Sequence, residues 1–141
     1  MNKNILIADD CKTILQIYKT MLRSNTEEED FNVNTFMEGK SLLDYFKKEY
    51  EGGNRIPLCI LDIDMPVMDG LTAARELRNI DSNVIIIIVT AMDNFSLKDI
   101  KENLHDNIYY IRKPFNNKEL LCLITSLVTG WNHVEELNKR E

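Results

Sequence analysis

Four apolar segments of this chain each run into polar side chains that could take part in chemistry at phosphorus. One segment ends in the acidic pair Asp9-Asp10 and another in Asp62, while two later segments end in Thr90 and Lys113. A carboxylate can attack phosphorus and form an acyl phosphate, whose oxygens then need cationic and hydroxyl partners. Crowded carboxylates repel one another unless a cation lies between them, and such oxygen ligands suit Mg²⁺. The set therefore contains the parts that phosphorylation of an aspartate requires.

Each of these residues also has an ordinary structural interpretation. Asp9-Asp10 could cap a helix, because aspartate is a favoured N-cap residue. Thr90 suits a strand and Lys113 suits a solvated surface. Asp62 differs from them, because it ends an apolar run, where an idle buried carboxylate is costly. Four polar positions at four segment ends favour the chemical interpretation over separate coincidences.

The elements that must position these side chains alternate regularly. Short runs rich in apolar and β-branched residues are followed by longer runs with helical spacing. The segment 83–89 is an almost unbroken run of Ile and Val, as in a central strand covered on both faces. This alternation predicts an α/β fold, a doubly wound parallel sheet with helices on both faces and ligands beyond the carboxyl ends of its strands. The predicted strands are 4–8, 31–36, 58–63, 83–89 and 108–111, and the predicted helices are 11–24, 40–50, 69–80, 97–104 and 117–128.

Length and composition exclude several classes of protein. The 141 residues suit one compact domain, and the net charge of −6 disfavours nucleic-acid binding by this chain alone. The longest apolar stretch is too short to span a membrane, and residues 1–4 lead into the first strand without a signal peptide. We therefore expect no membrane association and a cytoplasmic location. Cys11, Cys59 and Cys122 lie far apart without a CxxC pair, so small hydrophobic roles are favoured over metal binding.

The polar residues and their neighbours together resemble a known family. The segments in question are Ile7-Ala8-Asp9-Asp10, Leu61-Asp62-Ile63-Asp64-Met65-Pro66-Val67-Met68-Asp69-Gly70, Val89-Thr90-Ala91 and Tyr110-Ile111-Arg112-Lys113-Pro114-Phe115. In order and approximate spacing, they are similar to the signature segments of response regulator receiver domains of two-component systems. The resemblance covers residues 4 to about 128. It implies a flavodoxin-like (βα)5 fold with strand order 2-1-3-4-5 and a cis peptide bond between Lys113 and Pro114.

The resemblance also implies a phosphoacceptor and a metal site. Asp62 would accept a phosphoryl group from the phosphohistidine of a histidine kinase or a phosphotransfer protein, in a Mg²⁺-dependent phosphorelay. Asp10, Asp62 and the backbone carbonyl of Asp64 would hold Mg²⁺, or Mn²⁺ in its place, and Asp9 would support the ion chiefly through water. Such a module is not an enzyme, since it catalyses only its own phosphotransfer and dephosphorylation.

A conformational switch is implied in the same way. Thr90 would bond a phosphoryl oxygen and move towards it, while Lys113 would pair with the phosphate. Tyr110 matches the aromatic residue that rotates inwards as Thr90 moves, although it could equally be an ordinary strand aromatic. The change would alter the face formed by the fourth helix, the fifth strand and the fifth helix, which a partner or a second copy in a homodimer would recognise.

The chain departs from the family pattern at three places. Asp64 is an additional acid two positions after the acceptor, and Met92 lies two positions after Thr90. We hypothesise that this pair tunes the lifetime of the phosphorylated state. Residues 104–107 replace the Gly-Ala pair that often precedes the fifth strand, and His105 among them is expected at the surface.

Two competing functions come from other classes. Asp62-Ile63-Asp64 imitates the DxD motif of haloacid-dehalogenase-type phosphatases, which also form an aspartyl phosphate with Mg²⁺. Pro66 lies where that family has Thr or Val, and the chain is short for a phosphatase with a cap domain. The second rival is an interaction module that is never phosphorylated, but such modules usually lack one of the site residues, and none is missing here.

The C-terminal segment admits two interpretations. We predict a receiver domain over residues 1–128 and an extension over residues 129–141. The extension could begin a coiled-coil linker into an effector domain beyond residue 141, or Gly130 could end the last helix and leave a frayed tail. The apolar positions with heptad-like spacing are Leu120, Ile124, Leu127, Trp131 and Val134.

Overall fold

The structure, a computed structural model, describes residues 1–23, 31–65, 67–91 and 107–139. Five strands within these ranges form one parallel sheet in the order β2-β1-β3-β4-β5, which confirms the predicted order. All five predicted strands are present, with small shifts at their ends. The strands are β1 (Asn4–Ala8), β2 (Asn32–Phe36), β3 (Leu58–Asp62), β4 (Ile85–Thr90) and β5 (Ile108–Arg112).

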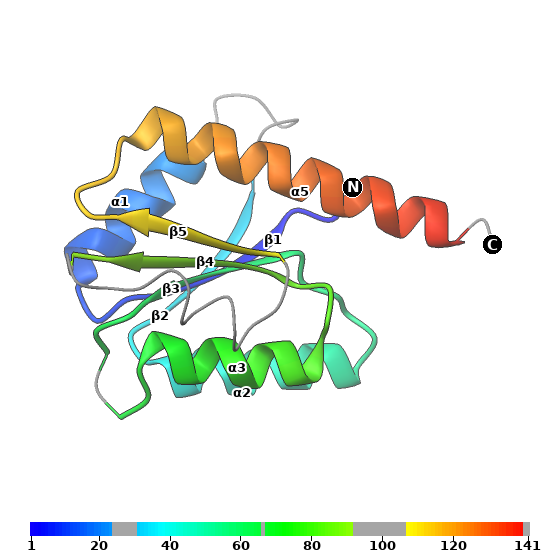
Figure 1. The fold of residues 1–141 in the computed structure, drawn as a ribbon, viewed down its shortest axis with the longest axis horizontal. Helices are drawn as coiled ribbons and strands as arrows, with labels where there is room; N and C mark the ends of the chain where they lie inside the picture. The colour runs from blue at the N-terminus through cyan, green and yellow to red at the C-terminus, as the bar shows by residue number, and fades with distance from the viewer. Residues whose placement is uncertain (24–30, 66, 92–106, 140–141) are drawn as a thin grey trace.

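Helices cover both faces of this sheet, as predicted (Figure 1). On one face lie α1 (Lys12–Leu22) and α5 (Asn117–Lys139), and on the other lie α2 (Gly39–Glu51) and α3 (Gly70–Ile80). The predicted helix 97–104, together with Pro66, Met92 and His105, lies outside the described residues. No helix in the described ranges is long and apolar enough to cross a membrane.

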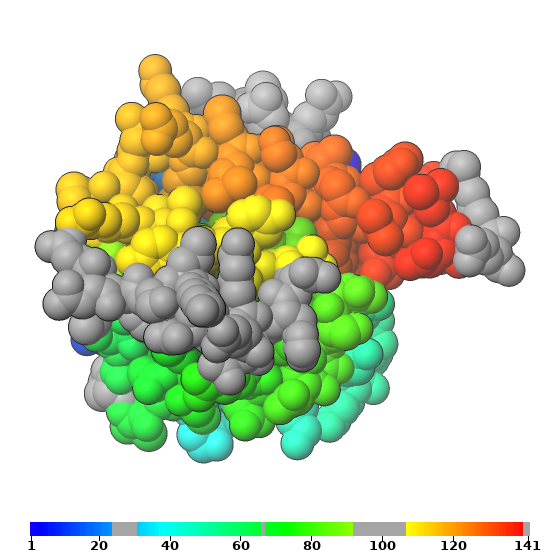
Figure 2. All heavy atoms as spheres, in the orientation of Figure 1, coloured from blue at the N-terminus to red at the C-terminus, as the bar shows by residue number. Residues whose placement is uncertain are grey.

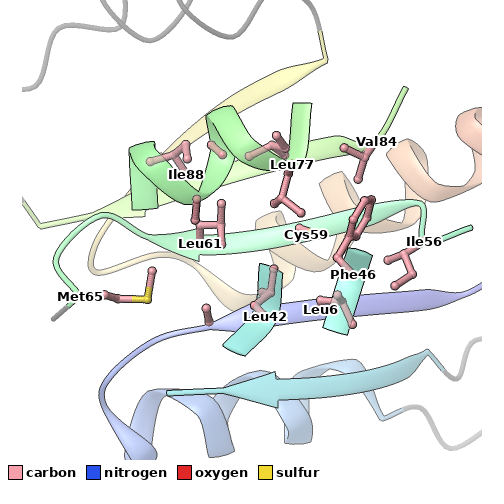
Figure 3. Close-up of a cluster of buried hydrophobic side chains, with 14 of the residues drawn as sticks. Leu6, Leu42, Phe46, Ile56, Cys59, Leu61, Met65, Leu77, Val84 and Ile88 are labelled. Atoms are coloured by element: carbon pink, nitrogen blue, oxygen red, sulfur yellow. The ribbon is translucent and has the colours of Figure 1, made fainter. Parts of the chain in front are cut away.

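Alternation along the strands divides the core into two layers. Successive side chains of a strand point to opposite faces, so neighbouring residues of β3 enter different layers. Cys59 and Leu61 pack with Phe46 of α2 and Leu77 of α3, in the layer that Figure 3 shows. Ile60 packs on the other face with α1 and α5. Because both layers cover β3 and β4, all residues of these two central strands are buried, including the polar residues at their carboxyl ends.

The last helix is longer than predicted. The interpretation in which Gly130 ends it is wrong, because α5 continues without a break to Lys139, and its C-terminal end projects beyond the sheet (Figures 1 and 2). The apolar positions predicted as one coiled-coil seam are divided: Ile124 and Trp131 are buried, whereas Val134 is 54% exposed. That residues 129–141 form an extension separate from the domain stays a prediction.

Contacts between distant residues explain why α5 continues past Gly130. The guanidinium of Arg55 lies 5.5 Å from the centre of the Trp131 ring, and its Nη1 lies 3.3 Å from Oε2 of Glu135. The same guanidinium makes two bonds of 3.1 Å to the carboxylate of Asp81, which is almost fully buried. The side-chain amide of Asn132 binds the backbone of Asn2 at 2.7 Å in both directions. These contacts offset the cost of about 1 kcal/mol that glycine brings to a helix interior.

Candidate functional site

Asp62 is the last residue of β3, at the carboxyl end of the sheet. Its neighbours along β3 are fully buried, and its own exposure is 5%. The backbone N–H of Asp64 donates to Oδ1 of Asp62 at 3.3 Å. The chain therefore holds one carboxylate at the edge of the core, with its other oxygen 3.4 Å from Nζ of Lys113, which follows β5.

Two further carboxylates lie beside it at the end of β1. One carboxylate oxygen from each of Asp9, Asp10 and Asp62 lies within 4.8 Å of the others. Asp9 is buried and Asp10 is exposed, so the cluster has one side open to water. Oδ1 of Asp9 accepts a bond of 2.9 Å from the N–H of Cys11, which is itself the N-cap of α1 and makes no side-chain capping bond. The interpretation of the acidic pair as the N-cap of this helix is therefore wrong.

Lys113 completes the cluster from the end of β5. Its Nζ lies 3.0 Å from Oδ2 of Asp9 and 3.4 Å from Oδ2 of Asp62. Its backbone N–H donates to the carbonyl oxygen of Thr90 at 2.8 Å, and its bond to Pro114 is cis, as predicted. The side chain is 21% exposed, so the interpretation of Lys113 as a solvated surface charge is wrong.

The site has the electrostatics of a partly desolvated carboxylate pair with one cation. Burial, followed by the negative charge of Asp9, raises the pKa of Asp62, while Lys113 and the Asp64 N–H act in the opposite direction. Burial lowers the pKa of Lys113, but the hydrogen bond and charges of Asp9 and Asp62 outweigh it and leave that pKa raised. Lys113 is therefore held as an ammonium, and the remaining negative charge of the cluster favours binding of a cation.

A close backbone contact fixes the segment that follows Asp62. The start of α3 approaches β3 so closely that a Cβ atom on Gly70 would collide with the carbonyl oxygen of Asp62. The N–H of Gly70 donates to the carbonyl of Ile63 at 3.2 Å, and the side chain of Asp69 caps α3 by accepting from Thr72 at 2.8 Å. This role of Asp69-Gly70 was not predicted from the sequence, although Gly directly after an N-cap Asp signals a close approach.

Thr90, Tyr110 and Asp64 were also predicted as residues of the site or the switch, and they differ in their positions. Thr90 ends β4 and is fully buried beside Asp62, whose strand pairs with β4. Tyr110 of β5 is half-buried and packs against the α2–α3 layer. Asp64 is exposed. The structure thus brings Asp9, Asp10, Asp62 and Lys113 into one cluster, with Thr90 next to it and Tyr110 further along β5.

The donor set of this cluster fits a hard divalent cation. Three carboxylates offer oxygen atoms close to one another, and the exposed side leaves room for water, which Mg²⁺ keeps when it binds to proteins. None of the three cysteines belongs to this set: Cys59 is buried in the α2–α3 layer, and Cys11 and Cys122 are exposed. The exposure of the latter two is contrary to the small hydrophobic role expected of them.

Comparisons with known proteins agree with this architecture. The family model described as response regulator receiver domain matches residues 5–125. The "Heme response regulator HssR" of Staphylococcus epidermidis is 33% identical over 125 residues, covering 89% of this chain and 51% of that protein. The "Response regulator SaeR" of Staphylococcus aureus is 29% identical over 134 residues, covering 89% and 50%. The chain therefore spans about half the length of these relatives.

Solved structures give the same result. A CheY-like receiver domain protein from Methanospirillum hungatei superposes with a TM-score of 0.77 at 25% identity, covering 94% of this chain and 98% of that one. A receiver domain protein from Clostridium thermocellum gives 0.75 at 28% identity, with 93% and 98% covered. CheY in a CheX-CheY-BeF3-Mg complex from Borrelia burgdorferi gives 0.71 at 26% identity, with 88% and 87% covered. With its flavodoxin-like fold and the family match over most of its length, the chain belongs to the response regulator receiver domains of two-component systems.

Proposed function

We propose that this chain is a phosphorylation-activated switch in which Asp62 accepts a phosphoryl group from the phosphohistidine of a histidine kinase or phosphotransfer protein. The observation that carries the proposal is the contact of Asp62 with Lys113, at 3.4 Å, within a cluster of three carboxylates. A structural ion pair would not need the second and third carboxylates, which raise the cost of burying charge at this edge of the core.

The transfer uses groups that lie at the strand ends. A carboxylate oxygen of Asp62 attacks phosphorus, the new P–O bond forms, and the P–N bond of the phosphohistidine breaks, so that the imidazole leaves with the electron pair. The ammonium of Lys113 stabilises negative charge on the phosphoryl oxygens, and the hydroxyl of Thr90 donates to one of them. Asp9 keeps Lys113 in place before the phosphoryl group arrives, because their 3.0 Å contact already orients the ammonium.

Receiver domains generally bind Mg²⁺, and the acidic cluster supports the same for this chain. We assign the ion to Asp10, Asp62 and the backbone carbonyl of Asp64, with Asp9 acting through water. When bound, Mg²⁺ or Mn²⁺ would neutralise the repulsion between carboxylates and the incoming phosphoryl group. The CheY relative whose complex contains both BeF3 and Mg supports this assignment, since its fold matches at a TM-score of 0.71.

The output follows from a shift between two conformers. Phosphorylation favours the conformer in which Thr90 and Tyr110 move inwards, and this changes the face that includes β5 and α5. A downstream protein, a homodimer partner or an effector domain reads that face. An effector domain is supported by the relatives, which are about twice as long as the matched region. The proposed location of the chain is the cytoplasm, where histidine kinases present their phosphohistidine.

Intact-mass spectrometry of the protein with acetyl phosphate and Mg²⁺ tests this function. We expect a mass gain of one phosphoryl group. No gain is expected when a chelator removes the metal before acetyl phosphate is added. Sustained release of inorganic phosphate from small phosphate esters, without an accumulated phosphoprotein, would instead identify a phosphatase. Absence of any mass gain, in a sample that folds and binds Mg²⁺, would identify an unphosphorylated interaction module.

A further inference from the structure

Tyr18 of α1 is an aromatic residue buried to 1% exposure on the face of the sheet that also carries α5. Its ring stacks on Phe115, with centroids 5.3 Å apart and an angle of 28° between the planes. Phe115 precedes α5 and lies two positions after Lys113. The stack therefore joins α1 to the loop that carries the ammonium of the site.

Lys113 is held by contacts on both sides of its backbone. On the β4 side, its N–H donates to the carbonyl of Thr90 at 2.8 Å. On the other side, the ring of Pro114 fixes its φ angle and so removes one of the backbone rotations between Lys113 and Phe115. Because only Pro114 separates the two residues, a displacement of Phe115 would shift Lys113, whose Nζ lies 3.0 Å and 3.4 Å from oxygens of the two buried carboxylates.

The phenol of Tyr18 is also sensitive to the charge of the site. Burial raises the pKa of its phenol well above the usual range, and the negative charges of Asp9 and Asp62 raise it further. The ring of Tyr18 belongs to the close-packed core of the α1–α5 layer, where loss of its volume would displace the neighbours that pack on it, Phe115 among them.

We propose that Tyr18 is a positioning residue for phosphoryl transfer: through its stack on Phe115, it holds the ammonium of Lys113 beside Asp62. This inference rests on the proposed role of Asp62 as phosphoacceptor. Tyr18 does not touch the reacting atoms, and its effect is transmitted through Lys113 alone. The effect of Tyr18 on phosphoryl transfer can therefore be measured separately from the contribution that any large core side chain makes to stability.

A double-mutant cycle with Lys113 tests the transmission. The rate of phosphorylation by acetyl phosphate with Mg²⁺ is measured by intact mass for wild type, Tyr18→Leu, Lys113→Ala and the double variant. We expect Tyr18→Leu to slow labelling about tenfold, since small misplacements of a charge-stabilising group have effects of this order or larger. In the Lys113→Ala background, the same substitution is expected to change the slow residual rate by less than about twofold.

Two matched variants distinguish the positioning of Lys113 from a general loss of core packing. Tyr18→Phe keeps the stacked ring and is expected to restore the wild-type rate. Phe46→Leu truncates a similarly buried aromatic side chain in the other layer, on the opposite face of the sheet, and is expected to lower the unfolding midpoint without slowing labelling. If Lys113→Ala labels too slowly at first, a higher acetyl phosphate concentration and a longer incubation bring its residual rate into the measurable range. If Tyr18→Leu does not fold, as judged by circular dichroism, Phe115→Leu takes its place.

Three results overturn the inference: a wild-type rate for Tyr18→Leu, an equal loss with and without Lys113, or an equal loss in Phe46→Leu. Failure of the proposed function has a different signature, because wild type itself then gains no phosphoryl group and every variant in the cycle is equally silent.

Discussion

Nζ of Lys113 lies 3.0 Å from Oδ2 of Asp9, so a side chain from the end of β5 meets one from the end of β1. These strands are not neighbours, because β3 and β4 lie between them in the sheet. Lys113 therefore extends over the ends of both central strands, where Thr90 and Asp62 lie. This single contact gathers residues from four strand ends into one site, and it pre-orients the cation for an arriving phosphoryl group.

Metal binding should stabilise the fold through the acidic cluster. A ligand that binds only the folded state at ten times its dissociation constant contributes about 1.4 kcal/mol, so Mg²⁺ should raise the unfolding midpoint. Asp10→Asn should weaken this response at little structural cost, because Asp10 is exposed. Thermal unfolding across a Mg²⁺ titration measures the effect. Asp44→Asn, which changes a 64% exposed carboxylate on α2, is the control; an equal response in both variants contradicts a site at Asp10.

The pH dependence of stability should carry the signature of Asp62. Burial and the charge of Asp9 raise its pKa from the usual 3.8, so between that value and the raised one the folded state binds more protons than the unfolded state. The free energy of unfolding therefore falls as pH rises through this window. Asp62→Asn has no carboxylate to ionise at this position, so its free energy of unfolding should not fall in this way. The variant should therefore be more stable than wild type near neutral pH without metal, and the difference should vanish in acid. Urea unfolding in chelator measures it; a less stable variant at neutral pH would refute the sign.

Two glycines should respond to alanine in opposite directions. Gly70→Ala places a methyl group against the carbonyl of Asp62, and such overpacking typically costs about 1–3 kcal/mol. The same shift should slow phosphorylation, because it displaces the acceptor. Gly130 lies inside α5 with open space where the methyl group of an alanine would lie, so Gly130→Ala should stabilise by about 1 kcal/mol. Urea unfolding measures the change in the free energy of unfolding of each variant. Equal changes in the two variants would contradict the close contact at Gly70.

Arg55 should contribute to stability well beyond an ordinary surface charge. Arg55→Met leaves the carboxylate of Asp81, which is 2% exposed, without its guanidinium partner, and we expect a loss of about 2 kcal/mol. Lys40→Met is the matched control, because it breaks an exposed pair with Asp44 and should cost no more than about 0.5 kcal/mol. Chemical denaturation compares the two. A loss in Arg55→Met as small as that in Lys40→Met would show that Arg55 does not hold α5 to the body.

The sheet and the cluster could be predicted because their signals are local. The burial of every residue in β3 and β4 follows from nearly unbroken runs of apolar residues, and in a parallel sheet the residues after such runs meet at one edge. Asp9, Asp62 and Lys113 were found in this way although they lie far apart in sequence. The roles assigned to Thr90, Tyr110 and Asp64 rest on the family resemblance and stay predictions.

The parts that sequence did not reveal depend on contacts between distant residues. The length of α5 is one, since Gly130 weakens the local helical signal and the stabilising partners, Asn2 and Arg55, lie at the other end of the chain. The contact of Lys113 with Asp9 is another, because no pattern specifies which carboxylate a lysine meets before phosphate is present. The stack of Tyr18 on Phe115 likewise needs the positions of α1 and the β5–α5 loop, whereas helical spacing marks Tyr18 only as a core residue.

The most direct test of the central claim is the mass of the protein after treatment with acetyl phosphate and Mg²⁺, compared between Asp62→Asn and Asp44→Asn. Both substitutions remove one carboxylate and keep its shape, but only Asp62 lies in the cluster with Lys113. We predict that wild type and Asp44→Asn gain one phosphoryl group and that Asp62→Asn gains none. Labelling of Asp62→Asn to the same extent as wild type would contradict the assignment of Asp62 as the phosphoacceptor.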